Sequence, residues 1–395
     1  MARKSESTVV ERAPLDTQGS SSSRPAKAVF ERERLRRHRG SHRRVWCFRL
    51  AAVGSALLGA LLVAELALRL LVVQEGKRLA TYDAELGWRG RPNGTGVYAR
   101  SEDKIRTPFR YNALGFRDND VLPKVSDGKR LLILGDSFVE SLEVDFPQTF
   151  GAQIEKSIQA RVPCWDVTLM GSQGYSTAQE LIAFRKYRSL VDPDVVVLCF
   201  YCGNDFQDNL RQRFAYLDAD RQLVLPASQV PWWMHQARRL QRWVYETSHV
   251  VYLLKNTIEG LTDVQLAPES KAAVEQSEEY QQDITERLIV QLQREVIESG
   301  ARLGIVCIPA RDDLLSGDTS KVDWLIHLCT ANQIPCIDLS PQLAIKHFFK
   351  VDFHLNATGH QVVAQTLEAF ALAPQLAGYE LGDMPAASNQ AAWSE

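Results

Sequence analysis

The chain has 395 residues and a formal net charge of −2, and charged residues make up 24% of it. This balance argues against nucleic acid as a partner, because proteins that bind nucleic acid usually carry a clear excess of basic residues. The first 49 residues are nevertheless rich in arginine, lysine and serine, whereas the remainder is mildly acidic. Such a contrast indicates a basic tail joined to a folded body.

Residues 1–44 are predicted to be a disordered, basic, cytoplasmic tail. They contain four consecutive serines, 20–23, followed by a cluster of arginines from Arg32 to Arg44. A segment of this composition buries too little apolar surface to offset its chain entropy. Nucleic-acid binding is one interpretation of the arginines, but the cytoplasmic flank of a membrane helix agrees better with the segment that follows.

Residues 45–74 are predicted to form a transmembrane signal-anchor helix, with residues 50–73 inside the membrane. Those residues span roughly 36 Å as a helix, enough to cross a hydrocarbon core of about 30 Å. Eight arginines lie in the stretch of about 20 residues before this segment, against four lysines or arginines in the stretch after it. The charge difference places the N-terminus in the cytoplasm and the folded domain outside it, which we take to be the periplasm.

The apolar segment has two alternative interpretations. A cleaved signal peptide would need a shorter basic region and a small-residue cleavage site, and neither is evident in the sequence. A buried core helix is disfavoured because apolarity on every side is combined here with strong flanking charge. The signal-anchor therefore remains the preferred interpretation.

The folded part is predicted to be an α/β domain, namely a three-layer α/β/α sandwich with a parallel central sheet over residues 129–372. Residues 75–128 are predicted to be a lead-in segment, in which residues 80–128 are rich in glycine, arginine and asparagine and are expected to form loops. Residues 373–395 are predicted to be a C-terminal tail. Apolar strands alternating with helical patterns indicate a parallel sheet that is covered on both faces. The predicted strands begin at Arg130, Asp166, Asp194, Arg302 and Pro335, and the predicted helices are 147–160, 177–190, 278–299, 320–331 and 358–371.

The stretch at about 212–275 interrupts this alternation and is predicted to be an inserted, mainly helical cap. It contains Trp232, Trp233 and Trp243 among several arginines and tyrosines. These aromatic residues could line a substrate cleft or pack on the core, and packing is the more common use of such residues.

The seven cysteines do not indicate a disulfide framework, because their number is odd and their spacing irregular. Cys199 and Cys202 form a C-x-x-C sequence at the end of an apolar run, with no second pair of ligand-like residues nearby in the sequence. We interpret them as buried thiols, since free cysteine behaves as a small hydrophobe. Disulfide formation stays open if the domain is exported.

Polar and glycine-rich sequences follow three of the predicted strands, and a fourth precedes the last predicted helix. In chain order they are Gly135-Asp-Ser137-Phe, Gly171-Ser-Gln-Gly174, Cys202-Gly-Asn204-Asp and Asp352-Phe-His354-Leu-Asn356. In open α/β sheets, ligands bind at the carboxyl ends of the strands. These four blocks are therefore expected to meet at one edge of the sheet.

In this order the four blocks resemble those of the SGNH (GDSL-type) hydrolase family, over roughly residues 128–372. The resemblance implies that Ser137 is the nucleophile, His354 its base and Asp352 the acid that orients the base. It further implies an oxyanion hole made by the backbone N–H groups of Ser137 and Gly174 and the side-chain amide of Asn204. No metal and no cofactor is expected.

The chain departs from the family pattern in three places. The acid and base are spaced D-x-H where D-x-x-H is common, Gly203 directly precedes Asn204, and Leu169 stands where the second block often has asparagine. Taken singly, each block also has a structural reading: Ser137 could be a helix N-cap, Gly174 a turn residue and Asn204 a loop cap. His360, inside the last predicted helix, is expected to be structural.

The predicted reaction is serine-dependent cleavage of an acyl or acetyl ester, on an envelope carbohydrate or lipid by analogy with the family. A serine hydroxyl is a weak nucleophile at its own pKa and needs an adjacent base. Two other classes remain open: an O-acyltransferase that uses the same residues on a polysaccharide, and a catalytically silent carbohydrate-binding module of the same fold.

Overall fold

The computed structural model describes residues 24–376 except 73, 75, 78, 126–127, 212–213, 227–230, 266–277 and 374–375, with side chains from residue 44 onward except in 259–265. The chain divides into two compact units, residues 1–66 and residues 67–395. Most of the predicted C-terminal tail lies outside the described residues.

The first helix is longer than the sequence predicts. Helix α1 runs from Arg24 to Leu71, so residues 24–44 are helical where a disordered tail was expected. Most of that stretch consists of arginine, glutamate, alanine and leucine, which are good helix formers and can extend a helix that the apolar segment nucleates. Residues 1–23 lie outside the described part. Within α1, Arg44–Leu71 is long and apolar enough to cross a membrane, which makes it a candidate span.

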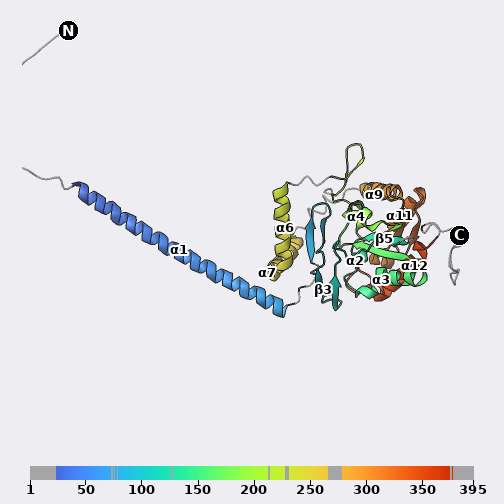
Figure 1. Ribbon diagram of the computed structural model, residues 1–395, viewed down its shortest axis with the longest axis horizontal. Coiled ribbons are helices and arrows are strands. Elements are labelled where there is room, and N and C mark those ends of the chain that lie inside the picture. Colours follow the sequence, from blue (N-terminus) through green and yellow to red (C-terminus); the bar gives the residue numbers. More distant parts are fainter. Residues whose placement is uncertain are drawn as a thin grey trace, which may run out of the picture. The chain divides into compact units, whose positions relative to one another are not determined.

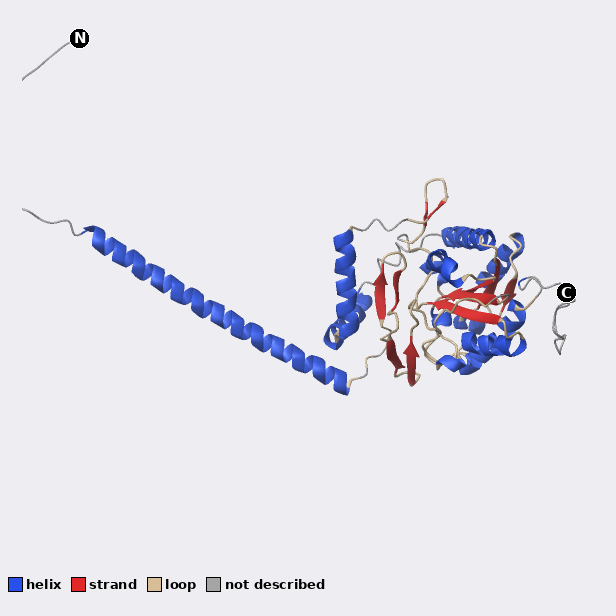
Figure 2. Ribbon diagram, in the orientation of Figure 1, coloured by secondary structure: helices blue, strands red, loops and turns tan. Residues whose placement is uncertain are grey.

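The second unit is built on a five-stranded parallel sheet, as predicted (Figure 2). Its strands lie in the order β11-β10-β7-β5-β6. In chain order they are β5 (Lys129–Gly135), β6 (Trp165–Gly171), β7 (Val195–Tyr201), β10 (Arg302–Ile308) and β11 (Cys336–Asp338). Four of the five strands are apolar nearly throughout, as expected where both faces of a parallel sheet are covered.

Helices cover the two faces of this sheet and complete the three-layer sandwich (Figure 1). The longer ones are α3 (Phe150–Arg161), α4 (Thr177–Val191), α9 (Glu278–Glu298), α11 (Ser320–Ala331) and α12 (Ala357–Ala371). All five were predicted, although α3 starts later than expected because Pro147 lies in a separate 3-10 turn, η1 (Phe146–Gln148). The shorter helices are α2 (Ser137–Glu140), α5 (Asp205–Asp208), α10 (Arg311–Ser316) and η2 (Ile345–His347).

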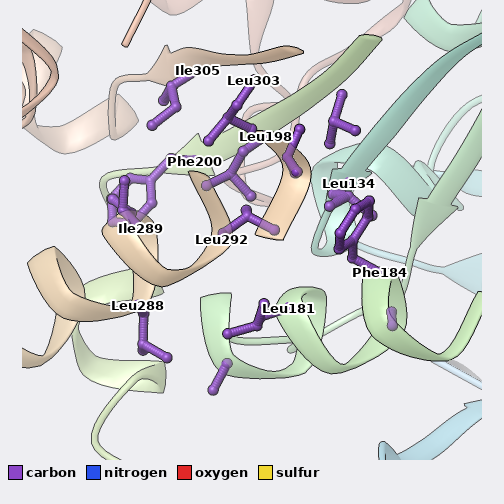
Figure 3. Close-up of a cluster of buried hydrophobic side chains, with 14 of the residues drawn as sticks. Leu134, Leu181, Phe184, Leu198, Phe200, Leu288, Ile289, Leu292, Leu303 and Ile305 are labelled. Carbon is purple, nitrogen blue, oxygen red and sulfur yellow. The ribbon is translucent and has the colours of Figure 1, made fainter. Parts of the chain in front are cut away.

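Alternate side chains of each strand belong to two separate apolar cores, one on each face of the sheet. On one face, Leu134, Leu198 and Ile305 pack with side chains of α4, α9 and α11, as Figure 3 shows for α4 and α9. On the other face, Ile133 and Val197 pack with side chains of α3 and α12. Successive side chains of a strand point to opposite faces, so each strand contributes to both cores. Cys199 and Cys202 are both buried thiols, as predicted.

The segment before the sheet is not made of loops, which corrects the expectation for residues 80–128. It forms two antiparallel hairpins, β1 (Ala80–Asp83) with β2 (Gly87–Gly90), and β3 (Thr95–Arg100) with β4 (Ile105–Arg110). In β4 buried and exposed residues alternate along the strand, which is the pattern of a half-buried hairpin. The strands have only four to six residues each. Because they contain several glycines and charged residues, the sequence shows no clear alternation of apolar and polar residues.

The stretch predicted as a helical insertion contains two helices and a short hairpin. The helices are α6 (Trp232–Thr247) and α7 (His249–Gln265), and the hairpin pairs β8 (Tyr216–Leu217) with β9 (Leu223–Val224). The three tryptophans of α6 are 60–75% exposed, so they do not pack on the core, contrary to the preferred interpretation.

Candidate active site

Three of the four sequence blocks leave the sheet at one edge. The chain forms β5 first, then β6 on one side of it and β7 on the other, so the strand order reverses at β5. Gly135 pairs with Gly171, and Leu134 pairs with Leu198, so the three strands end at nearly the same level. A reversal of strand order opens a crevice at the carboxyl ends of the strands, where ligands usually bind.

Ser137 is the first residue of α2, directly after β5. Asp136 caps this helix by accepting a hydrogen bond from the N–H of Phe138 at 2.9 Å. The close approach of α2 to the sheet requires glycine at both strand ends, since a Cβ on Gly135 or Gly171 would come within 2.6 Å of Val139 atoms. The serine is thereby held at the sheet edge with only 5% of its surface exposed.

The fourth block places His354 and Asp352 against this serine. His354 Nε2 lies 2.7 Å from Ser137 Oγ, and His354 Nδ1 lies 2.5 Å from Asp352 Oδ1. All three side chains are buried. The three predicted residues therefore form one continuous hydrogen-bonded chain, although Ser137 and His354 are 217 positions apart in sequence.

The loop that carries Asp352 is held mainly from the β3–β4 hairpin. Arg100 Nη1 donates to Asp352 Oδ2 at 2.7 Å. The carboxylate of Asp103 accepts hydrogen bonds from the backbone N–H groups of residues 350–352, the shortest at 2.6 Å from Asp352. Arg311 adds donors to carbonyl oxygens of the same loop, including that of Asp352 at 3.3 Å. The short D-x-H spacing is thus accommodated by a loop with fixed backbone geometry.

Glu143 is a second acid beside His354 that the sequence did not predict. Its Oε1 lies 3.6 Å from His354 Nδ1, and the residue is 4% exposed. Among the described residues this oxygen has no hydrogen-bond partner. Glu143 follows α2 through Ser141, whose φ of 52° turns the chain back toward the site. No spacing or motif in the sequence signals that turn.

The two acids together control the charge of His354. Burial lowers the pKa of the imidazole, but the negative charge of Glu143 and the hydrogen bond that Asp352 accepts from Nδ1 outweigh this effect and raise the pKa to about 9. Burial raises the pKa of Asp352, but its hydrogen bonds with His354 outweigh this and leave the pKa below the ordinary value. Burial also raises the pKa of Glu143, against the opposing charge of His354. His354 therefore holds its proton more tightly than an ordinary histidine.

Glu143, Asp352 and His354 could in principle hold a metal ion. Their ligand atoms lie within 4.8 Å of one another. However, Nδ1 of His354 already shares a 2.5 Å hydrogen bond with Asp352, and the Arg100 cation bonds the other oxygen of that carboxylate. A second positive charge there would face repulsion from Arg100. The arrangement favours proton transfer over metal binding.

Aromatic rings surround the imidazole of His354. Phe353 stacks on it with ring centroids 4.3 Å apart, and Phe138 lies at 5.1 Å. Tyr201 in turn packs on Phe138 at 4.1 Å. The other buried histidine of this region, His360, accepts a hydrogen bond from the backbone N–H of Phe150, and its pKa is lowered to about 3, first by burial and then by the charge of Arg117. His360 is therefore a neutral packing residue.

Gly174 and Asn204 lie in the loops that follow β6 and β7. Gly174 has a φ of +74°, and its carbonyl oxygen accepts a hydrogen bond from Arg211. The preceding residue is fixed as well, because the Gln173 N–H donates to Glu140 Oε2 at 2.6 Å. Asn204 precedes α5, and its Nδ2 donates to Asp208 Oδ2 at 3.1 Å. An asparagine amide carries two N–H groups, so this bond leaves a second one for a ligand.

No family model matches the chain, and no curated protein matches it either. Its structure is similar to several solved ones. One is that of TesA, 10% identical, covering 63% of this chain and 100% of that one at a TM-score of 0.39. A second is a GDSL-like lipase from Bacteroides thetaiotaomicron, 12% identical, covering 64% of this chain and 93% of that one at a TM-score of 0.36. A third is an acetyl xylan esterase, 12% identical, covering 60% of this chain and 97% of that one at a TM-score of 0.37.

The GDSL-like lipase and a further similar structure, described as a lipolytic protein of the G-D-S-L family, carry the name of the family that the sequence motifs resemble. At such low identities and TM-scores the likeness says nothing of the chemistry of this site, which rests on the distances given above.

Proposed function

We propose that this chain is a serine-dependent ester hydrolase in which Ser137 is the nucleophile, His354 the base and Asp352 the acid that orients it. The observation that carries the proposal is the hydrogen-bonded chain from Ser137 Oγ through both ring nitrogens of His354 to Asp352. Such a chain activates a serine hydroxyl and stabilises the imidazolium that forms when the proton moves. Both bonds are short and shielded from water, which favours this use.

The proposed reaction has two balanced stages. In the first, Ser137 Oγ bonds to the ester carbonyl carbon while its proton moves to His354 Nε2. The tetrahedral intermediate then collapses, the bond to the alcohol oxygen breaks, and that oxygen takes the proton from Nε2. In the second stage water repeats the sequence on the acyl-serine and releases the acid. An alcohol in place of water would give acyl transfer with the same residues.

The oxyanion of each tetrahedral intermediate needs donors that are already in place. We assign this role to the backbone N–H groups of Ser137 and Gly174 and to the second N–H of Asn204. Supporting this are the common edge of the sheet on which the three loops lie and the hydrogen bonds that hold the Gly174 and Asn204 loops. Removing one such donor typically costs about 2.7–4 kcal/mol of transition-state stabilisation.

A short acyl group such as acetyl fits this site better than a long chain. Ser137 is only 5% exposed, and the rings of Phe138 and Phe353 crowd the imidazole. Two pockets of about 400 and 420 Å³ are lined in part by the β3–β4 hairpin, and neither is lined by Ser137. The proposed substrate is therefore a small ester on a larger alcohol, and an envelope carbohydrate or lipid is the class that the membrane helix favours.

We further propose that α1 anchors the domain with the N-terminus in the cytoplasm and the active site outside it, in the periplasm. The excess of arginine before the apolar segment supports this orientation. The apolar part of α1, Arg44–Leu71, has the length that a bilayer requires.

The test is hydrolysis of p-nitrophenyl acetate and butyrate by the full-length protein in detergent micelles. We expect acetate to be cleaved faster than butyrate, and Ser137→Ala to lose more than about 10³-fold in kcat. Ser157→Ala is the matched control, because Ser157 bonds Glu368 on α12 and lies outside the site. Retained activity in Ser137→Ala would refute the mechanism. Adding a sugar as acceptor and recovering its acetyl ester would identify a transferase instead.

A further inference from the structure

Helix α6 has its apolar side chains on the outside. A surface helix of a globular protein normally turns its apolar face to the core and its charged face to solvent. In α6 four large apolar side chains are 60–75% exposed, and together with three exposed apolar residues of α7 they form what we call the outer apolar face. Its members are Trp232, Trp233, Leu240 and Trp243 of α6, and Leu253, Leu254 and Ile258 of α7.

The side of α6 that packs on the protein is polar. His235 Nδ1 lies 2.8 Å from the Tyr82 hydroxyl, and Arg238 lies over the ring of Tyr82. Arg242 Nε donates to the carbonyl oxygen of Ala80 at 3.2 Å. These contacts fix the rotation of the helix against β1, so the outer apolar face cannot turn inward without breaking them.

The α6–α7 junction is tied to the segment that leaves the candidate membrane span. Arg69, in the last turn of α1, donates to the carbonyl oxygen of Thr247 at 2.6 Å. Gln74 donates to the carbonyl oxygen of His249, also at 2.6 Å. Lys77 lies 5.5 Å from the ring centroid of Tyr252 on α7. The α6–α7 junction therefore contacts the last turn of the candidate span, which ends at Leu71.

We propose that the outer apolar face of α6 and α7 lies in the interfacial layer of the bilayer that α1 crosses. Tryptophan is enriched at the interface between headgroups and acyl chains, and amphipathic helices with arginine beside an apolar face bind there. Exposed Arg239 of α6 suits anionic headgroups at the same depth. The occupant is a lipid surface, because the contacts of Arg69 and Gln74 hold these helices beside the end of the span.

The test measures the surroundings of single labelled positions in the full-length protein reconstituted into vesicles of phosphatidylcholine and phosphatidylglycerol. Leu240→Cys on α6 carries an environment-sensitive nitrobenzoxadiazole label. Leu315→Cys on α10 is the matched control, since both leucines are 61–63% exposed and neither belongs to the candidate site. The exposed thiols Cys47 and Cys164 are first replaced by serine. Unfolding curves followed by circular dichroism establish that both variants are folded.

We expect the label at position 240 to emit at shorter wavelength than the label at position 315. We also expect only the first to lose intensity when the vesicles contain lipids with a nitroxide on the acyl chain. Equal, water-like emission at both positions would overturn the proposal. A blue-shifted label at position 240 that lipid nitroxides do not quench would also overturn it, because a second copy of the chain would then cover the face. The proposal rests on the proposed membrane anchor, but its readout does not depend on esterase activity, so its failure can be distinguished from failure of the proposed reaction.

Discussion

Two acids with very different surroundings lie beside Nδ1 of His354. Asp352 shares its oxygens with the ring and backbone of His354 and with Arg100, and its pKa lies below the ordinary value. Nδ1 of His354 lies 3.6 Å from Glu143 Oε1 but only 2.5 Å from Asp352 Oδ1. Among the described residues, Glu143 Oε1 has no hydrogen-bond partner. Two carboxylates near one imidazole thus serve differently, one by a directed bond and the other by charge.

Replacing Asp352 by asparagine tests the directed bond and has the largest expected effect. If the new amide turns its oxygen to His354, its NH₂ group faces Arg100, which is also a donor, so the hydrogen bond to Arg100 is lost. If it turns its NH₂ to His354, Nδ1 must act as the acceptor and the proton moves to Nε2, where it blocks transfer from Ser137. We expect kcat to fall by about 10³–10⁴-fold, as for wrong-tautomer variants of such triads, measured on p-nitrophenyl acetate. A loss below ten-fold would show that Glu143 can replace Asp352.

Replacing Glu143 by glutamine tests the effect of charge alone. Removing the negative charge should lower the pKa of His354 from about 9 toward its ordinary value. The base is active only when neutral, so the rise of kcat/KM with pH should move to lower pH by about one unit and activity at pH 7 should increase roughly ten-fold. Glu155→Gln is the matched control, because Glu155 is a half-buried acid beside Asp166 and Asn119. An unchanged pH profile in Glu143→Gln would mean that Glu143 is uncharged in the working enzyme.

Replacing Arg100 by glutamine tests how much the positive charge beside Asp352 contributes to catalysis. Glutamine can still donate to Asp352 Oδ2, but the cation that helps to lower the pKa of this carboxyl is lost. Because Arg100 is partly exposed, solvent screens its charge, and we expect a loss of only about three- to ten-fold in kcat. The measurement is kcat against pH for Arg100→Gln beside Arg110→Gln, whose exposed partner is Asp120. Equal kcat in both variants would remove Arg100 from the positioning of Asp352.

Glu180 tests, with a smaller expected effect, how much a buried acid without a hydrogen-bond partner lowers the stability of the fold. Among the described residues neither of its carboxylate oxygens has a hydrogen-bond partner, and burial together with Asp136 and Asp208 raises its pKa well above the ordinary value. The folded state therefore keeps a proton that the unfolded state releases above about pH 4.3. The stability contribution of this group is present below that pH and is lost as the pH rises toward the raised folded value.

Glu180→Gln should accordingly stabilise the fold by about 1 kcal/mol, and by more at pH 8 than at pH 5. Thermal unfolding at both pH values checks this prediction, with Glu298→Gln, on the exposed end of α9, as the control. A variant that is less stable than the parent at pH 8 would contradict it.

The sequence predicted the parts of the fold whose signal is local. Apolar runs such as 130–135 and 195–201 place the strands, because a parallel strand covered on both faces is apolar nearly throughout. The hairpins of residues 80–110 were missed, since their strands are short and rich in glycine and arginine. The helix over residues 24–44 is hidden from a reading of charge alone, because a high arginine content is typical of disordered segments and arginine is also a good helix former.

Residues of the candidate site could be predicted only where they lie in a sequence motif. Ser137, Asp352 and His354 were found because each lies in a recognisable block, and their catalytic roles stay predictions. Arg100 and Glu143 lie in no such block. Arg100 meets Asp352 across 252 positions, and Glu143 reaches His354 only because the chain turns sharply at Ser141. Contacts of this kind depend on the packing of a hairpin and a turn, which no local pattern encodes.

The β3–β4 hairpin bears on both acids at once. Asp103 in its turn holds the backbone of the Asp352 loop, Arg100 at the end of β3 binds the Asp352 carboxylate, and Thr107 of β4 donates to the carbonyl oxygen of Glu143. A two-stranded hairpin is marginally stable by itself and can open while a larger core stays folded. Heating should therefore abolish turnover at a lower temperature than the one at which helical ellipticity is lost, and cooling from that interval should restore it.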